Sequence, residues 1–328
     1  MSDIDSIDVS VQPPLPDRLL EGAVDTHVHA APFIDDSMFL VDVFQLSRAA
    51  ADAGMRAVVL KNWFGSSCPA AFLANRYAGG VQVLGGVVLN FAVGGINADA
   101  VRVAAHEGYD RGFRPGRVVW MPERSSLFRA RLLGLDAEDQ AKALSPFPGG
   151  DIDRPITPQA REVLDVIAEE DMVLATSHLG PDEALVFLEH ARAAGVTRMV
   201  VTHASSGGVR WSLDQKKRAV ELGACIEEAA ISWQPAMKAF GYPVTDAAVE
   251  MFAAMREIGP EHYVLASDSG MKIAPSPIES MRVFATLLLA SGFTGDEVRA
   301  MAVENPRRLL RLDQDDHRPP TTRNELKN

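Results

Sequence analysis

Short apolar segments alternate with longer amphipathic segments along most of the chain. The apolar segments are continuous and rich in valine, which is typical of strands buried on both faces of a parallel sheet. The predicted strands are Val24–Thr26, Ala57–Leu60, Val81–Leu89, Arg117–Met121, Val173–Thr176, Arg198–Thr202, Ala224–Glu227 and Tyr263–Ser267. Continuous apolar strands of this kind indicate an α/β fold.

A segment with apolar residues at helical spacing follows each predicted strand. Gly54 is suited to end the first of these helices, and Pro181 is suited to begin the fifth. The predicted helices are Val41–Ala53, Cys68–Tyr77, Asn97–Glu107, Thr157–Glu170, Pro181–Ala194, Leu213–Leu222, Asp246–Ile258 and Pro277–Ser291, with a closing helix at Asp296–Val303. Eight strand–helix units predict a (β/α)₈ TIM barrel; a doubly wound open sheet is the alternative.

The segment between the fourth strand and its helix, Pro122–Pro155, is long, polar and rich in proline and glycine. Such insertions are usually lids or disordered loops, and we favour a lid-like insertion over the mouth of the barrel. We assign residues 22–312 to the barrel and residues 1–21 to an N-terminal extension. Residues 313–328 form a polar C-terminal tail that we expect to be disordered.

Composition narrows the class of protein. The chain is 47% hydrophobic and 23% charged, within the globular range, and its net charge of −12 disfavours nucleic acid and anionic membranes as partners. No apolar run reaches the roughly 20 residues of a membrane span, and the acidic N-terminus lacks signal-peptide features. With only Cys68 and Cys225, a reducing cytoplasm fits best. We therefore expect a cytoplasmic protein with a small-molecule substrate; barrels often dimerise, so a homo-oligomer is left open.

Four of the eight histidines lie where predicted strands end. His27 and His29 end the first strand, His178 follows the fifth, and His203 follows the sixth. Asp268 follows the eighth strand. Because strand ends of a barrel open onto one face, these residues are predicted to converge, and imidazole with carboxylate is a ligand set for a divalent metal such as zinc.

Each of these residues has an ordinary structural interpretation when taken alone. The i, i+2 spacing points both imidazoles of His27 and His29 to the same side of a strand, but such pairs are often only polar strand ends. A strand-end histidine such as His178 can be a hydrogen-bonded core residue, and Asp268 can cap the following turn. The complete set favours metal ligation and metal-assisted catalysis.

This ordered set resembles the amidohydrolase superfamily, which has His-x-His on the first strand, histidines on the fifth and sixth, and aspartate on the eighth. The flanking segments DTHVH, GMRAVVLK, ATSHLG and VVTHAS further resemble an uncharacterised bacterial branch of that superfamily. The resemblance implies His27, His29, His178, His203 and Asp268 as metal ligands. It also implies Asp268 as the acceptor of the water proton and His203 near the substrate oxygen. Zinc is the favoured ion, with Mn, Fe, Ni and Co as alternatives.

The fourth strand departs from the pattern of superfamily members that hold two ions through a carboxylated lysine or a glutamate there. It ends in VWMPE without a lysine, and Glu123 lies beyond a proline, which makes a bridge from Glu123 doubtful and favours one ion over two. Lys61, at the end of the second strand, can be a carboxylated ligand, a cation that binds substrate, or a lysine at the solvated rim. Glu227 is a candidate substrate-binding residue, with Glu228 beside it either facing inward or solvated.

The sequence thus predicts a metal-dependent hydrolase that opens an amide, lactone or related carbonyl bond with metal-activated water. Three alternatives stay open at this point. They are a mononuclear-metal decarboxylase of the same superfamily, a phosphoesterase, and a metal-binding barrel that has lost catalysis.

Overall fold

Eight parallel strands form one sheet whose order in space is their order in the sequence. The computed structural model describes residues 19–313, except 34, 109–112, 235–237, 239–240 and 242–246. The strands are β1 (Val24–Val28), β2 (Ala57–Leu60), β3 (Gln82–Val88), β4 (Gly116–Trp120), β5 (Val173–Ala175), β6 (Met199–Val201), β7 (Ala224–Ala229) and β8 (Tyr263–Ala266). Valine-rich sequence buried on both faces explains why these segments become strands.

The first and last strands meet and close the sheet into a barrel. The amide of Asp268 donates to the carbonyl of His27 (2.8 Å), and that of His29 donates to Ser269 (2.9 Å). The carboxylate of Asp25 accepts from the amide of Ser267 (2.9 Å), which ties the middle of β1 to β8. The predicted (β/α)₈ barrel is therefore confirmed, and the open sheet is wrong.

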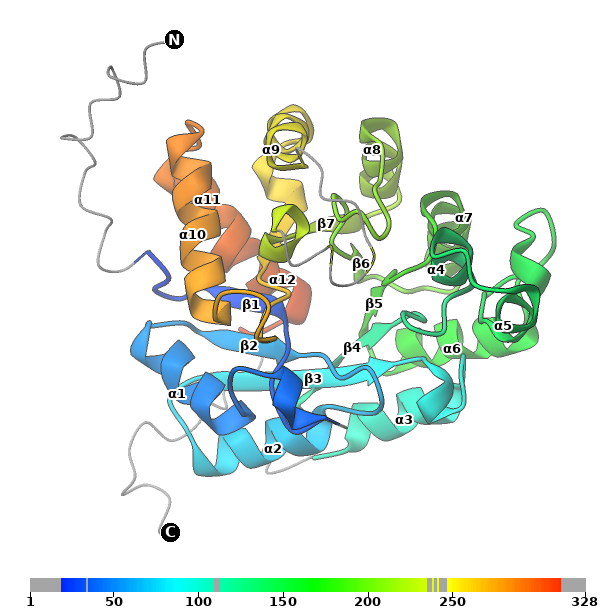
Figure 1. The fold of residues 1–328 in the computed structure, drawn as a ribbon, viewed down its shortest axis with the longest axis horizontal. Helices are drawn as coiled ribbons and strands as arrows, with labels where there is room; N and C mark the ends of the chain where they lie inside the picture. Colours follow the sequence, from blue (N-terminus) through cyan, green and yellow to red (C-terminus); the bar gives the residue numbers. More distant parts are fainter. Residues whose placement is uncertain are drawn as a thin grey trace.

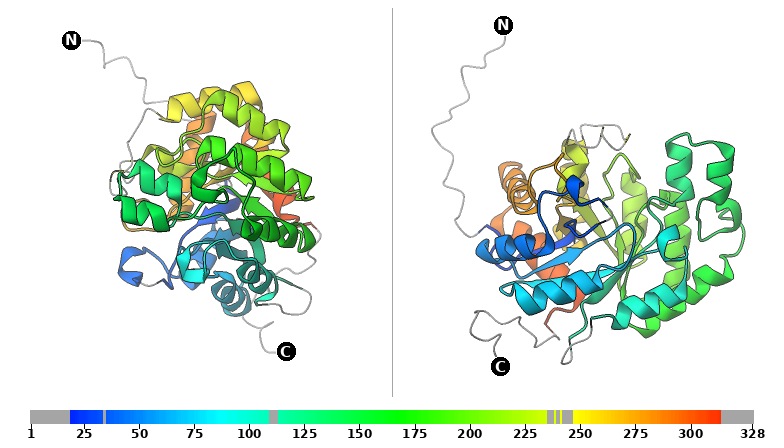
Figure 2. Two further views of the ribbon diagram at one scale, coloured as in Figure 1. Left: turned by 90° about the vertical axis from the view of Figure 1, so that its right-hand side faces the viewer. Right: turned by 60° about the horizontal axis from the view of Figure 1, so that its bottom comes forward.

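Helices surround the strands on the outside of the barrel (Figures 1 and 2). The α-helices after the strands are α1 (Val43–Asp52), α2 (Cys68–Tyr77), α3 (Ala98–His106), α6 (Pro158–Glu169), α7 (Pro181–Ala193), α8 (Leu213–Glu221), α9 (Ala247–Ile258) and α10 (Pro277–Ala290). Short 3₁₀ turns are η1 (Asp36–Met38), η2 (Phe91–Val93), η3 (Pro148–Gly150), η4 (Ala230–Trp233) and η6 (Pro260–His262). Side-chain caps such as Asp42, Thr157 and Ser212 satisfy the free amides that begin α1, α6 and α8.

The insertion after β4 is not an irregular loop. It contains α4 (Leu127–Leu132) and α5 (Ala137–Lys142), and Ser126 caps the start of α4. Whether this segment moves as a lid stays a prediction.

The closing helix also runs further than the sequence predicted. From α11 (Gly295–Arg299) the chain continues through a π-helical turn, η7 (Ala300–Glu304), into α12 (Asn305–Leu310). Asn305 anchors this continuation by donating its side-chain amide to the carbonyls of Pro260 and Tyr263.

The core has an inner and an outer part. Val24, Val173 and Val264 pack inside the barrel with Leu309 and Leu310, so the C-terminal helix covers the end at which the strands begin. The outer part lies between strands and helices. The opposite end of the barrel is left for the polar strand ends.

The remaining expectations concern the ends of the chain, the membrane and the cysteines. Most of the predicted N-terminal extension and of the predicted C-terminal tail lies outside the described residues. No helix within the described residues is both long and apolar enough to cross a membrane. Cys68 and Cys225 are free thiols.

Candidate metal centre

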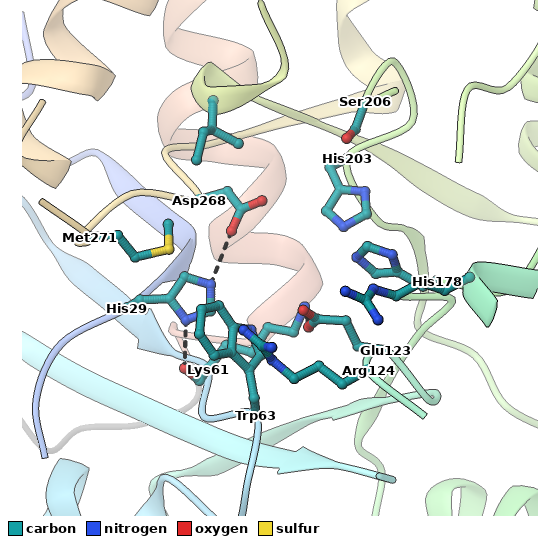
Figure 3. A pocket seen from close by; sticks show the side chains of 12 residues that line it. His29, Lys61, Trp63, Glu123, Arg124, His178, His203, Ser206, Asp268 and Met271 are labelled. Carbon is teal, nitrogen blue, oxygen red and sulfur yellow. Dashed lines mark hydrogen bonds and ion pairs between the residues drawn. The ribbon is translucent and has the colours of Figure 1, made fainter. Parts of the chain in front are cut away.

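The polar strand ends line an open cavity of about 480 Å³ at the mouth of the barrel. Its wall is formed by His29, Lys61, Trp63, Glu123, Arg124, Arg129, His178, His203, Ser206, Ile231, Asp268 and Met271. Figure 3 shows His29 and Asp268 on one side of this cavity and His178 and His203 on the other. Residues predicted from six different strand ends therefore meet at one place.

His27, His29 and Asp268 form the tightest group. The Nε2 atoms of His27 and His29 lie 3.1 and 3.0 Å from the same oxygen, Oδ1 of Asp268. One ligand atom from each residue falls within 4.8 Å of the others, an arrangement that can hold a metal ion. The two imidazoles are fully buried, so the group is shielded from bulk water.

The opposite nitrogens of the two imidazoles fix their tautomers. Nδ1 of His29 lies 2.9 Å from the carbonyl oxygen of Lys61, and Nδ1 of His27 lies 3.0 Å from Oε1 of Glu227. Because both partners are acceptors, each Nδ1 carries the proton, and the neutral ring presents a lone pair at Nε2. Three acceptor atoms then face one another, and Nε2 of His27 has no hydrogen-bond partner within the described residues. A cation at their centre would satisfy all three.

Burial favours the neutral imidazole at His29 and His203, whereas the neighbouring carboxylates favour the charged form of His27. Burial lowers the pKa of His29, and it lowers the pKa of His203 to about 4. For His27, burial is outweighed by the carboxylates of Asp268 and Glu227, and its pKa is raised. Burial alone would raise the pKa of Asp268, but the neighbouring histidines hold it well below its usual range. Neutral imidazole and ionised carboxylate are the protonation states that bind a metal.

His178 and His203 form a second group beside the first. Their ring centroids are 4.8 Å apart, and the ring of His203 is 5.9 Å from that of His27. Burial keeps the pKa of His178 well below its usual value. Nδ1 of His203 is buried without a hydrogen-bond partner among the described residues. The structure thus brings together all five predicted ligands; their ligand roles stay predictions.

Glu227 lies behind the histidines and does not line the cavity. Besides its contact with His27, its carboxylate accepts from the hydroxyl of Thr26 (3.2 Å) and the amide of His203 (3.3 Å). A bulge in β1 lets the consecutive residues Thr26 and His27 both reach it. Glu227 is therefore placed to orient His27, and its expected contact with substrate stays a prediction.

Glu228 is buried rather than solvated. Its carboxylate pairs with the ammonium of Lys216 on α8 (2.7 Å) and accepts from the amide and hydroxyl of Ser205 (3.0 and 2.8 Å). The pair faces away from the cavity, and it fixes the loop that carries His203.

Lys61 and Glu123 form a buried ion pair inside the cavity, with 2.7 Å between Nζ and Oε2. Lys61 is 2% exposed, so the interpretation of a lysine at the solvated rim is wrong. The sequence made a place for Glu123 at the site doubtful, because Glu123 lies beyond a proline. In the structure, the Glu123 side chain nevertheless lines the cavity. Burial alone would raise the pKa of Glu123, but Lys61 and His178 hold it well below its usual range.

Residues with strained, left-handed backbone conformations lie at the same strand ends. His203 and Asp268 have φ of 35° and 48°, and Ser177 at the end of β5 has φ of 51°. Side chains rarely adopt this left-handed region, and such residues tend to occur at functional sites. Gly270 has φ of 128°, and a Cβ there would lie 1.8 Å from the carbonyl oxygen of His29. Only glycine lets the chain after Asp268 pass so close to β1.

Sequence reasoning missed several residues of the cavity wall. Arg124 and Ser206 lie on loops, where no periodic pattern predicts which side chains turn inward, and Arg129 lies on the short helix α4. Trp63 lines the cavity as an aromatic wall beside His29, with ring centroids 4.8 Å apart. Trp233 packs on Phe284, with ring centroids 4.7 Å apart, and does not line the cavity.

Comparison with known proteins first defines the class of fold. Solved (β/α)₈ structures similar to this chain include the phosphotriesterase homology protein from Escherichia coli, complexed with phosphate in its active site. That match has a TM-score of 0.58 and 17% identity, and it covers 88% of this chain and 98% of that one. An organophosphorus hydrolase from Deinococcus radiodurans matches with a TM-score of 0.56 and 16% identity, over 90% and 93% of the two chains. An amidohydrolase from Pseudomonas aeruginosa matches with a TM-score of 0.52 and 12% identity, over 90% and 97%.

The (β/α)₈ barrel of this chain is therefore the fold of these phosphotriesterase-like and amidohydrolase structures. Residues 22–227 match the model of DUF6282, a family of unknown function, and the chain belongs to this family. No curated protein matches the sequence.

Proposed function

We propose that this protein is a metal-dependent hydrolase of small molecules. The observation that carries the proposal is the convergence of two imidazole Nε2 atoms on one oxygen of Asp268, an arrangement of three acceptors that fits a cation. The fold supports it, because similar barrels include an organophosphorus hydrolase and an amidohydrolase.

His27, His29 and Asp268 would hold the ion, with His178 and His203 completing its surroundings from the other side of the cavity. Zinc suits this nitrogen and oxygen donor set, and Mn, Fe, Ni and Co are alternatives. A divalent ion there would supply Lewis acidity, which favours ionisation of water and polarises the bond to be cleaved.

The protein's own groups would manage protons and orientation. Asp268, held ionised, is the group suited to accept the proton of the attacking water. His203, neutral and buried, has an Nδ1 atom without a partner among the described residues and is suited to contact the substrate oxygen. Glu227 and the carbonyl of Lys61 hold the two β1 imidazoles in one tautomer.

We favour one ion over two. A second ion bridged by Glu123 would have to displace the ammonium of Lys61, which lies 2.7 Å from that carboxylate. As a cation, Lys61 neutralises Glu123 inside the cavity, whereas a carboxylated Lys61 would place two anions in contact. The structure therefore favours an uncarboxylated Lys61.

The bond cleaved is an amide, lactone or related carbonyl bond in our first interpretation. A phosphoester is the second candidate, favoured by the cationic side chains Lys61, Arg124 and Arg129 in the cavity wall. A panel of lactones, aryl esters, amides and phosphoesters distinguishes the two by the product released.

The proposal is tested first by metal content. Purified wild-type protein is expected to retain a divalent ion by inductively coupled plasma mass spectrometry, and His27→Ala and His178→Ala to lose much of it. His106→Ala is the matched control, because that histidine is half exposed on α3 and pairs with Glu170. A wild-type protein that takes up no divalent ion under metal-replete conditions would refute the proposal.

A further inference from the structure

Two arginines of the cavity wall take no part in the metal site or the proton transfer proposed above. Arg124 and Arg129 both lie on the segment that follows β4, Arg124 before α4 and Arg129 within it. Both line the same cavity as Asp268 and the strand-end histidines. Their position at the site raises the question of what they bind.

The cavity is cationic although the protein is acidic. Its lining contains three cationic side chains, Lys61, Arg124 and Arg129, and two carboxylates, Glu123 and Asp268, which leaves a net charge of +1. The whole chain carries a net charge of −12. Lys61 and Glu123 form an ion pair of 2.7 Å, and the other two cationic side chains of the lining are those of Arg124 and Arg129. A local excess of positive charge attracts an anionic ligand.

Arg124 is held in place by stacking. Its guanidinium lies 4.2 Å from the ring centroid of Trp63 and 5.7 Å from that of Phe64. Figure 3 shows Arg124 extending alongside Trp63 at the cavity. Stacking uses the face of a guanidinium, whereas its hydrogen bonds leave from the edge, so a stacked arginine is preorganised for two-pronged hydrogen bonding to a carboxylate or a phosphate.

Trp63 adds a donor to the same wall. It lines the cavity and is 4% exposed, yet its indole Nε1 is buried with no hydrogen-bond partner among the described residues. An indole N–H can only donate, so a ligand that satisfies it must accept. An oxyanion is such a ligand.

The arginines are fixed to the rest of the site by two polar residues. The side-chain oxygen of Asn90 accepts from the amides of Glu123 (2.9 Å) and Ser125 (3.1 Å), and its nitrogen donates to the carbonyl of Trp63 (3.0 Å). Ser126 donates to the carbonyl of His178 (2.6 Å) and caps α4. The wall that carries both arginines is thus built onto the loops of Trp63 and His178.

We propose that Arg124 and Arg129 bind an oxyanion group of the substrate, a carboxylate or a phosphate, while the bond to be cleaved lies at Asp268 and the histidines. The substrate is then an anionic small molecule. The statement that this anion is a substrate rests on the proposed hydrolase. The statement that the wall binds an anion rests on the residues of the wall alone.

Isothermal titration calorimetry with inorganic phosphate and, separately, with succinate tests the site. Metal content is measured on every sample. Wild-type protein is expected to bind at least one of the two anions, and Arg124→Gln and Arg129→Gln to weaken that binding about tenfold each, the loss typical of a charge-assisted contact. Arg124→Lys is expected to recover part of the affinity, because charge returns without the planar fork.

Arg131→Gln is the matched control, since Arg131 is exposed on the same helix and its guanidinium donates to the carbonyl of Gly149. Thermal melts show that each variant is folded. The inference is overturned if wild-type protein binds neither anion, or if the two glutamine variants bind as tightly as Arg131→Gln, as expected for an anion held by the metal alone. Arginine-dependent binding in a protein without metal would sustain the anion site and refute the hydrolase.

Discussion

Lys216 on α8 and Glu228 on β7 form an ion pair, 2.7 Å long and 3% and 0% exposed, behind the loop that carries His203. Lys216 also donates to the hydroxyl of Ser205, which in turn donates to the same carboxylate. The three side chains supply one another's hydrogen-bond partners in a buried environment, so each depends on the other two.

Replacing Lys216 by methionine is expected to destabilise the fold by about 3–5 kcal/mol, because it leaves the Glu228 carboxylate buried and uncompensated. Urea denaturation followed by circular dichroism measures the change. The matched control is Lys217→Met, whose exposed pair with Glu257 should contribute less than about 1 kcal/mol. Equal effects of the two substitutions would contradict this account of the network.

Glu227→Gln is expected to lower metal affinity roughly 10- to 100-fold, because the carboxylate that orients His27 through Nδ1 is lost. Competition with a chromogenic chelator measures the affinity. Glu257→Gln, on an exposed helix face, serves as the control. An unchanged affinity in Glu227→Gln would show that His27 needs no such partner or binds no metal.

Gly270→Ala is expected to cost at least about 2 kcal/mol of stability and to reduce metal content, because the added Cβ meets the carbonyl of His29 in a strained backbone conformation. Differential scanning calorimetry and metal analysis measure the two effects. Gly65→Ala is the control, since a Cβ there meets nothing within 4 Å. If both variants melt at the same temperature and hold equal amounts of metal, the close approach of the Gly270 backbone to the carbonyl of His29 is not needed.

The two thiols are expected to be inert in the folded protein. Burial raises the pKa of Cys68 to about 12 and also raises that of Cys225, so neither is a thiolate near neutral pH. Titration with a thiol-reactive disulfide at pH 8 should label almost nothing until denaturant is added, and then two thiols per chain. Rapid labelling of native protein would contradict the burial of Cys68 and the raised thiol pKa of both residues.

The sequence predicted those parts of the site that depend on strand ends. His27 lies near the end of the first strand, and His178 and Asp268 each follow a short strand; the closed parallel topology then places all of them at one mouth. The helices α4 and α5 were missed, because each spans a single short segment and buries few residues. A partner distant in sequence leaves no periodic signal, which is why the burial of Glu228 could not be foreseen.

The residues that would bind an ion come from the two strands farthest apart in the sequence, since His27 lies on β1, His29 directly follows it, and Asp268 follows β8. A cation bound there would link the ends of β1 and β8 across the seam at which the barrel closes. A growing polypeptide would have to be translated beyond Asp268 before it could bind its ion there, and removal of the ion by a chelator would loosen the barrel first along that seam.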